Sequence, residues 1–170
     1  MNRIVYIVPY FGRLRSDFKL WLASCKMNPT INWLIYTDDK ENDVLLNKDI
    51  PENVMVRYIS FEEMRNKIQK YFDFEIELPA PYKLCDYRPA YGEIFHDEIC
   101  EYDFWGHCDM DLIFGNIRDF LTDDILENYD RIGRWGHSIL YRNTPENNAR
   151  YKNSVSYTHL RAHETSLHLV

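Results

Sequence analysis

The sequence has no long hydrophobic run and no cluster of basic residues. Its longest apolar stretches fall far short of the roughly 20 residues that a membrane-spanning helix needs. The formal net charge is −7. A nucleic-acid-binding protein normally carries a basic stripe, because phosphate contacts dominate its affinity. The sequence therefore predicts neither a membrane span nor a nucleic-acid partner.

The sequence also lacks cysteine pairs with CxxC spacing. Its four cysteines are Cys25, Cys85, Cys100 and Cys108, so neither a zinc knuckle nor a redox motif is indicated. We expect reduced thiols of the kind found in cytosolic proteins. The first apolar run is short and is broken by Pro9, which is not typical of a signal peptide. A cytoplasmic location is the expectation.

The composition predicts one folded domain. The chain has 170 residues, of which 45% are hydrophobic and 15% aromatic. A domain of this size buries roughly 70% of the surface that its unfolded chain exposes, so a core can form without disulfides.

Short β-branched and aromatic runs alternate with segments of helical spacing. Strands are predicted at 3–12, 31–39, 53–60 and 103–114, and helices at 16–29, 60–72, 90–100 and 116–130, the last of them interrupted. Residues 78–90 are Pro-rich and are expected to be irregular, and 131–144 to form a strand or hairpin. Ser16 is the expected N-cap of the first helix, and Ser60 with Glu63 forms a capping-box pattern. This order indicates an α/β fold with a mostly parallel sheet.

Two carboxylates, Asp109 and Asp111, follow an apolar segment and precede another. Strand alternation would place both side chains on one face. Carboxylates near a core are costly unless a cation or strong donors compensate them. They therefore suit a hard divalent cation such as Mg²⁺ or Mn²⁺, which would also hold a substrate diphosphate. In the alternative, they only cap a turn or pair with Arg118 or Arg131.

Two histidines have two interpretations each, and Cys108 has one. His107 is a metal ligand or, the preferred interpretation, a hydrogen-bonded core histidine. His137, in "RWGHSILYRN", lies near an acceptor or has no site role. Cys108 alternates with the aspartates and is expected to point into the core.

Five segments resemble a known family: "IVPYFG", "WLIYTDD", "PYKLCDYRPAYGEIF", "YDFWGHCDMDLIFGNI" and "GHSILYRNT". Together they resemble a bacterial family of uncharacterised, glycosyltransferase-like proteins and, more broadly, the GT-A nucleotide-sugar glycosyltransferases with their DxD motif. The resemblance runs from residue 3 to about 152. It implies a GT-A-like, Rossmann-like fold, with a mostly parallel sheet flanked by helices, that is C-terminally truncated.

The resemblance also implies roles for individual residues. The loop of Pro9, Tyr10, Phe11 and Gly12 would lie against the nucleotide, and Asp38 would contact the base or ribose. Lys83, Asp86 and Arg88 would face the donor sugar and diphosphate, and Asp109 and Asp111 would bind Mn²⁺ or Mg²⁺. The local sequence also allows purely structural roles: a turn at Asp38, surface charges at Lys83 and Arg88, and core aromatics at Tyr10 and Phe11.

By the same resemblance, the protein is a metal-dependent glycosyltransferase. It would transfer a sugar from a nucleotide-sugar, with a UDP-sugar preferred, to a cell-surface polysaccharide or glycoconjugate. The acceptor would be a glycan or a lipid-linked sugar, met at the inner face of the membrane. GT-A enzymes often take a third metal ligand, the acceptor contacts and the catalytic base from later in the chain. We therefore expect this fragment to hold a donor half-site and to be inactive.

Two other functions remain open. A metal-dependent phosphohydrolase or nucleotidyltransferase also places aspartates at strand ends, and it would need the further carboxylates of Asp119, Asp123 and Asp124. A non-catalytic carbohydrate-binding module is suggested by the abundance of Tyr and Trp.

The segment 154–170, "SVSYTHLRAHETSLHLV", differs from the rest. It resembles translated sequencing-adapter DNA, so the expectation is a native domain over 1–153, the N-terminal part of a longer one, with a non-native tail. His159 and His163 have helical metal-ligand spacing, but no role is assigned to them for this reason.

Overall fold

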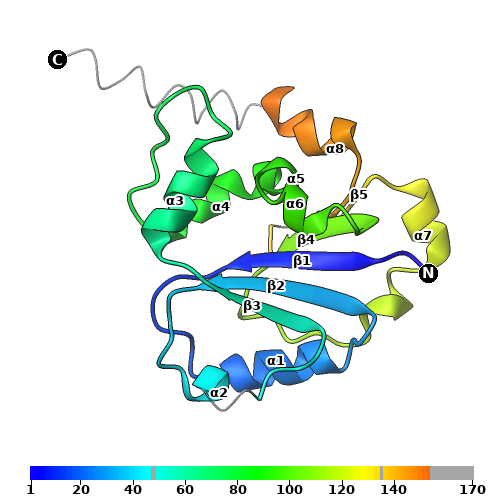
Figure 1. Cartoon of the computed structure of the whole chain (residues 1–170). Coiled ribbons are helices and arrows are strands. Elements are labelled where there is room, and N and C mark those ends of the chain that lie inside the picture. Colours follow the sequence, from blue (N-terminus) through cyan, green and yellow to red (C-terminus); the bar gives the residue numbers. More distant parts are fainter. Residues whose placement is uncertain (47–48, 135, 154–170) are drawn as a thin grey trace.

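The computed structural model describes residues 1–46, 49–134 and 136–153, and its centre is a six-stranded sheet in the order β3-β2-β1-β4-β6-β5 (Figure 1). The strands are β1 (Ile4–Pro9), β2 (Ile31–Thr37), β3 (Val54–Tyr58), β4 (Phe104–Cys108), β5 (Arg131–Ile132) and β6 (Ser138–Arg142). All six lie within the segments that the hydrophobic pattern predicted as strands.

Strands β1 to β4 run parallel to one another. Strand β6 runs antiparallel to both of its neighbours, β4 and β5. β1 pairs in parallel with both β2 and β4, and β2 pairs in parallel with β3. β6 runs antiparallel to β4, and β5 completes a hairpin with it. The expectation of a mostly parallel α/β sheet is confirmed. In such a sheet the loops at the carboxyl ends of neighbouring strands meet at one edge, which is where ligands bind.

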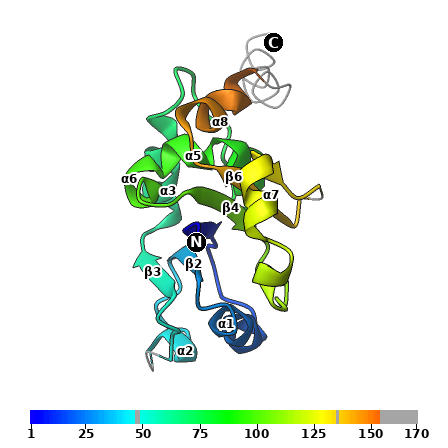
Figure 2. The ribbon, with the colours of Figure 1, turned by 90° about the vertical axis from the view of Figure 1, so that its right-hand side faces the viewer.

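Helices cover both faces of the sheet (Figures 1 and 2). One face carries α1 (Phe18–Lys26) and the short α2 (Asp43–Leu46). The other carries α3 (Phe61–Gln69), α4 (Leu84–Tyr87), α5 (Tyr91–Ile94), α6 (His96–Ile99) and α8 (Pro145–Ala149). Strand alternation sorts the side chains of β1 between the two layers: Ile4, Tyr6 and Val8 join one core, and Val5 and Ile7 join the other.

The two long helices begin differently. The capping box at α3 is confirmed, because the Ser60 side chain accepts from the Glu63 backbone N–H and the Glu63 carboxylate accepts from the Ser60 N–H. The expected N-cap at Ser16 is wrong. The N-cap is one residue later, at Asp17, and α1 starts at Phe18; Asp17 makes no side-chain cap bond, because its carboxylate is engaged by Arg15.

The Pro-rich segment is more helical than predicted. Residues 81–90 form η1 (Pro81–Lys83), α4 and η2 (Arg88–Ala90), with a proline in the first turn of each 3₁₀ helix, where no backbone donor is needed. The single helix expected over 90–100 is instead α5 and α6, separated at Phe95. The backbone of Phe95 leaves the helical region (φ −111°, ψ 21°), and its side chain is fully buried.

The interrupted helix at 116–130 is confirmed as η3 (Ile117–Asp119) and α7 (Asp123–Asn128). This segment lies at the amino end of the parallel strands, beside the N-terminus (Figure 1), where Arg118 donates from Nη2 to the Asn2 carbonyl at 2.8 Å. The chain then continues through β5, β6 and α8 to η4 (Arg150–Asn153). The tail predicted over 154–170 lies outside the described residues.

None of the described helices combines the length and the apolar character needed to cross a lipid bilayer.

Candidate functional site

Asp109 is the centre of a polar cluster at the carboxyl edge of the sheet. Its backbone follows β4 and is held by a hydrogen bond from its N–H to the His137 carbonyl at 2.8 Å. Arg88 donates from Nη2 to Oδ1 of Asp109 at 2.5 Å, and His137 Nδ1 lies 2.9 Å from Oδ2. Arg88 also donates from Nη1 to the Gly136 carbonyl at 3.1 Å. We call Arg88, Asp109 and His137 the Asp109 cluster.

The cluster is held by electrostatic attraction in a partly desolvated place. The exposed fractions of the Arg88 and Asp109 side chains are 21% and 26%, whereas that of His137 is 72%. Burial by itself would raise the pKa of the Asp109 carboxyl. The hydrogen bonds from Arg88 and His137 outweigh burial and lower that pKa. Asp109 is therefore a carboxylate whose two oxygens are both bound by protein side chains, and one of these side chains, His137, is largely exposed to solvent.

Asp111 does not share the environment of Asp109. Strand β4 ends at Cys108, and Met110 and Asp111 form a turn, so the alternation that would align the two carboxylates does not continue. Met110 is buried in the core on the α1 side, and Asp111 is exposed. Asp111 makes no hydrogen bond or ion pair with another described residue. The strand alternation on which the shared-face expectation rested therefore ends before it reaches either aspartate.

Asp109 and Asp111 fit a divalent cation only in company with other ligands. Among the described residues, no group of three or more His, Cys, Asp and Glu side chains could hold a metal ion. Mg²⁺ is commonly bound by one or two carboxylates, with water and substrate phosphate oxygens as the other ligands. The donor set thus suits a metal that binds together with a diphosphate better than one that binds alone.

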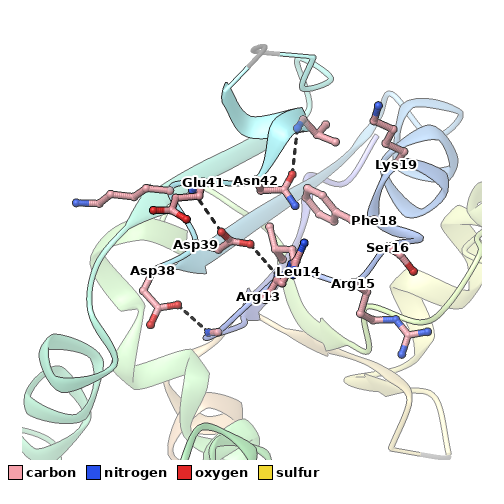
Figure 3. A pocket seen from close by; sticks show the side chains of 13 residues that line it. Arg13, Leu14, Arg15, Ser16, Phe18, Lys19, Asp38, Asp39, Glu41 and Asn42 are labelled. Atoms are coloured by element: carbon pink, nitrogen blue, oxygen red, sulfur yellow. Dashed lines mark hydrogen bonds between the residues drawn. The ribbon is translucent and has the colours of Figure 1, made fainter.

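A second feature of the same edge is a pocket between the loops after β1 and β2 (Figure 3). Its volume is about 1060 Å³, and we call it the loop pocket. Asp38 accepts a hydrogen bond from the Gly12 N–H at 2.7 Å, and Asp39 accepts one from the Leu14 N–H at 2.8 Å. These two carboxylates fix the loop after β1, where Gly12 has a φ of +87° that favours glycine.

The lining of the loop pocket mixes charges of both signs. Four of its side chains are cationic: Arg13, Arg15, Lys19 and Lys40. Arg15 is paired with Asp17, which raises the pKa of Arg15, and the negative charge of Asp111 adds to this shift. Asp111 therefore acts electrostatically on a residue of the loop pocket. Because β1 lies between β2 and β4, the loop pocket and the Asp109 cluster occupy neighbouring positions along one edge.

The residues predicted to touch the nucleotide divide into two groups. Gly12 and Asp38 line the loop pocket. Phe11 is buried and packs edge-on against Phe61 at 5.5 Å, so it belongs to the core, while Pro9 ends β1 and Tyr10 is half-buried against the other core.

The residues predicted to face the diphosphate also divide. Arg88 contacts Asp109 directly. Lys83 and Asp86 instead pair with each other at 2.6 Å on the exposed side of α4, with side chains 40% and 43% exposed. The structure brings Arg88 into the cluster but shows no contact between the Lys83–Asp86 pair and Asp109.

His107 and Cys108 are buried, as their preferred interpretations expected. Burial lowers the pKa of His107 to about 3, and the positive charge of Arg88 contributes. The prediction that His107 is hydrogen-bonded is not met at one atom, since its buried Nδ1 has no partner among the described residues.

The described residues argue against the further carboxylates of the first alternative function and against three tryptophans of the second, whereas exposed tyrosines such as Tyr82 and Tyr129 leave the second untested. Asp119, Asp123 and Asp124 belong to η3 and α7, which lie at the opposite end of the parallel strands from Asp109 (Figure 1). Of the tryptophans described, Trp21, Trp33 and Trp105 are all fully buried and so present no face to a glycan.

Sequence reasoning missed the pairing of Arg88 with Asp109 and the cationic lining of the loop pocket. The paired side chains are 21 residues apart, and Arg13, Arg15, Lys19 and Lys40 stand in no recognisable motif. A basic Arg-x-Arg directly after the first strand's loop is the one local signal that could have indicated the lining.

Comparison with known proteins gives a family but no activity. No curated protein sequence matches the chain. One similar solved structure is the apo form of mouse xyloside xylosyltransferase 1, with 12% sequence identity and a TM-score of 0.45 over 94% of this chain and 71% of that one. Likeness at this level establishes no function. A family model described as a family of unknown function (DUF6625) matches residues 6–168, and the chain belongs to that family.

Proposed function

We propose that this protein binds a nucleotide-sugar at the carboxyl edge of its sheet and acts as a metal-dependent glycosyltransferase. The observation that carries the proposal is the convergence of the loops after β1, β2 and β4 at one edge, which brings Asp38 and Asp109 there, where Arg88 of η2 pairs with Asp109. Ligands of open α/β sheets bind at this edge.

The chemistry of the edge supports a diphosphate ligand. Arg88 offers a guanidinium, a group suited to phosphate oxygens, and the loop pocket adds further cations. Asp109 and Asp111 would hold Mn²⁺ or Mg²⁺ with the diphosphate as a further ligand. The metal would act as a Lewis acid that stabilises the leaving nucleoside diphosphate.

The finer parts of the proposal rest on the sequence resemblance. The donor would be a UDP-sugar, and the acceptor a glycan or lipid-linked precursor of a cell-surface polysaccharide or glycoconjugate. The enzyme would act in the cytoplasm, at the inner face of the membrane. Lys83 and Asp86, which pair with each other in the structure, would face the donor sugar and diphosphate.

Calorimetric titration of UDP, with Mn²⁺ or with EDTA, tests the proposal. We expect binding that needs Mn²⁺ and that is lost in Asp109→Asn and in Asp111→Asn. The matched control is Glu52→Gln, an exposed carboxylate in the turn before β3, at the opposite edge of the sheet. It should bind as the unchanged protein does. Binding indifferent to EDTA and to Asp109→Asn would contradict the proposal.

A second measurement distinguishes transfer from hydrolysis. The protein is incubated with a UDP-sugar and, separately, with a generic phosphate monoester, each with Mn²⁺. Metal-dependent binding or turnover restricted to the nucleotide-sugar supports the proposal. Hydrolysis of the monoester with no preference for the nucleotide-sugar would favour a phosphohydrolase.

A further inference from the structure

A small pocket beside the Asp109 cluster has features of an anion site. It lies between the β5–β6 hairpin and the α8–η4 segment, with a volume of about 170 Å³. We call it the hairpin pocket; its lining includes Pro89, Arg131, Tyr141, Asn147, Arg150 and Tyr151. Sites for drug-sized ligands occupy roughly 300–1,000 Å³, so this one suits a ligand no larger than a single sugar unit.

The floor of the hairpin pocket is rigid. Tyr141 stacks on the fully buried Trp105, with ring centroids 4.6 Å apart and planes 22° from parallel. The Trp105 indole donates to Oδ1 of Asn148 at 2.6 Å, which fixes the lower ring. Tyr151 is buried, and its hydroxyl donates to Glu93 at 2.6 Å. An aromatic floor held in this way needs little reordering when a ligand binds.

The walls of the pocket carry an excess of positive charge. The Arg131 guanidinium carbon lies 5.9 Å from the Tyr141 ring centroid, and Arg150 lines the same space. Neither arginine forms an ion pair with a described residue. The carboxylate at the rim, Asp130, is already paired with Arg142 at 3.0 Å. Two guanidinium groups without an ion-pair partner thus line one pocket of a chain whose net charge is −7, and an oxyanion would neutralise them.

Asn147 adds a neutral polar group. Its residue is 8% exposed, and its Nδ2 donates to the Arg142 carbonyl at 3.3 Å. Its Oδ1 forms no hydrogen bond with a described residue and remains able to accept one from a ligand hydroxyl. A tyrosine ring, two guanidinium groups and an amide oxygen together match an anionic sugar derivative better than an inorganic ion alone.

The hairpin pocket adjoins the Asp109 cluster without being part of it. Pro89 directly follows Arg88, which binds Asp109. On the sheet, the Tyr141 ring lies 6.4 Å from the ring of His107, two residues before Asp109. The lining of the hairpin pocket is thus continuous with the segment that carries Arg88.

We propose that the hairpin pocket binds an oxyanion, a phosphate or a carboxylate, carried by the sugar acceptor. The assignment of the ligand as the acceptor rests on the proposed function; the anion site itself does not. The oxyanion would pair with Arg131 and Arg150, the sugar ring would pack on Tyr141, and a hydroxyl would donate to Asn147.

The test is an NMR titration of the full chain with three probes: glucuronate, glucose 1-phosphate and glucose. We expect glucuronate or glucose 1-phosphate to shift the Asn147 side-chain amide and the backbone signals of Tyr141 and Arg150, and glucose to shift none of them. Arg131→Gln/Arg150→Gln should weaken anion binding by about tenfold or more, because the oxyanion loses its charge-assisted hydrogen bonds. Binding of glucuronate would identify the oxyanion as a carboxylate, and binding of glucose 1-phosphate would identify it as a phosphate.

Two further variants serve as controls for the loss of anion binding. Arg131→Lys/Arg150→Lys keeps the charge and should retain part of the affinity, while Arg57→Gln, on the far edge strand β3, should change nothing. Circular dichroism shows whether each variant is folded. No shift at the pocket with either anion, or binding unaffected by the double Gln variant, would overturn the proposal.

Binding of UDP with Mn²⁺ is measured on the same variants. Unchanged UDP binding in Arg131→Gln/Arg150→Gln, with anion binding lost, supports two separate sites. If the protein binds the anion but does not bind UDP, the anion site is supported, but its assignment to the sugar acceptor is contradicted. UDP binding without anion binding overturns the inference alone and leaves the proposed function intact.

Discussion

Arg88 and Asp109 form an ion pair, with Nη2 of the arginine 2.5 Å from Oδ1 of the aspartate. The pair joins η2, on the helical layer, to the residue that follows β4. It explains how a carboxylate next to a core is tolerated in the absence of a metal, because a buried charge needs a partner of opposite sign. It also means that a metal at Asp109 would compete with a resident cation.

Replacing Arg88 should separate metal binding from nucleotide binding. In Arg88→Gln, Oδ1 of Asp109 loses its charged partner, so Mn²⁺ alone should bind more tightly. UDP should bind more weakly, by about tenfold, because the diphosphate loses a guanidinium. Calorimetry with Mn²⁺ alone and with UDP plus Mn²⁺ measures both. Arg57→Gln is the control, and equal weakening of both ligands would show that Arg88 serves only to maintain the fold.

Glu98 should make the stability depend on pH on the acid side. Burial opposes its ionisation, but Lys67 and Tyr36 donate to its Oε1 at 2.7 and 2.9 Å, and the net result is a lowered pKa. A carboxyl whose pKa is lower in the folded state stabilises the protein above its unfolded pKa, about 4.3, and loses this contribution as the pH falls through the folded value.

Glu98→Gln should therefore lower the free energy of unfolding by about 1–3 kcal/mol near neutral pH, and by less as the pH falls below about 4. Urea unfolding across this range measures the difference. The matched control is Glu101→Gln, whose carboxylate is 75% exposed and pairs with Arg3 at the surface. Its effect should not exceed about 0.5 kcal/mol. A Glu98→Gln deficit that does not change with pH would contradict the prediction.

Two serines before helices should differ in their contribution to stability. Ser60 caps α3 through a complete capping box, so Ser60→Ala should cost about 1 kcal/mol. Ser16 forms no cap bond to α1, so Ser16→Ala should cost no more than about 0.5 kcal/mol. Thermal or urea unfolding compares them, and equal losses would mean that the capping box adds nothing.

Two glycines should differ in the same way. A Cβ on Gly106, in β4, would overlap the carbonyl oxygen of Ile139 on β6, so Gly106→Ala should cost about 1–3 kcal/mol and loosen the strand pair that carries His137. A Cβ on Gly115 would meet nothing within 4 Å. Gly115→Ala should remain within about 0.5 kcal/mol of the unchanged protein. A tolerated Gly106→Ala would show that β6 can move away from β4.

Sequence reasoning succeeded where the cause of structure is local. The capping box at Ser60 needs only residues three apart, and the strand at 31–37 is marked by its own apolar run. It failed at Phe95, where burial against the sheet divides a helix that spacing alone predicted as continuous. It also failed at Asp111, because the strand ends before the alternation reaches it.

For the candidate site, the residue types could be read from the sequence, but not their partners. Asp38, Arg88 and Asp109 were named in advance, and Gly12 was placed in the correct loop. Their contacts join positions 21 to 28 residues apart. No local pattern encodes such pairings.

The sequence by itself determined the α/β pattern, the order of strands and helices, and two carboxylates after a buried strand. These follow from short-range periodicity and from capping, which depend on neighbouring residues. Only the tertiary structure decided that Arg88 pairs with Asp109, that Asp111 lies in an exposed turn after the strand, and that Arg131 and Arg150 line the same hairpin pocket. These depend on the order of strands in the sheet, which forms by contacts between distant parts of the chain.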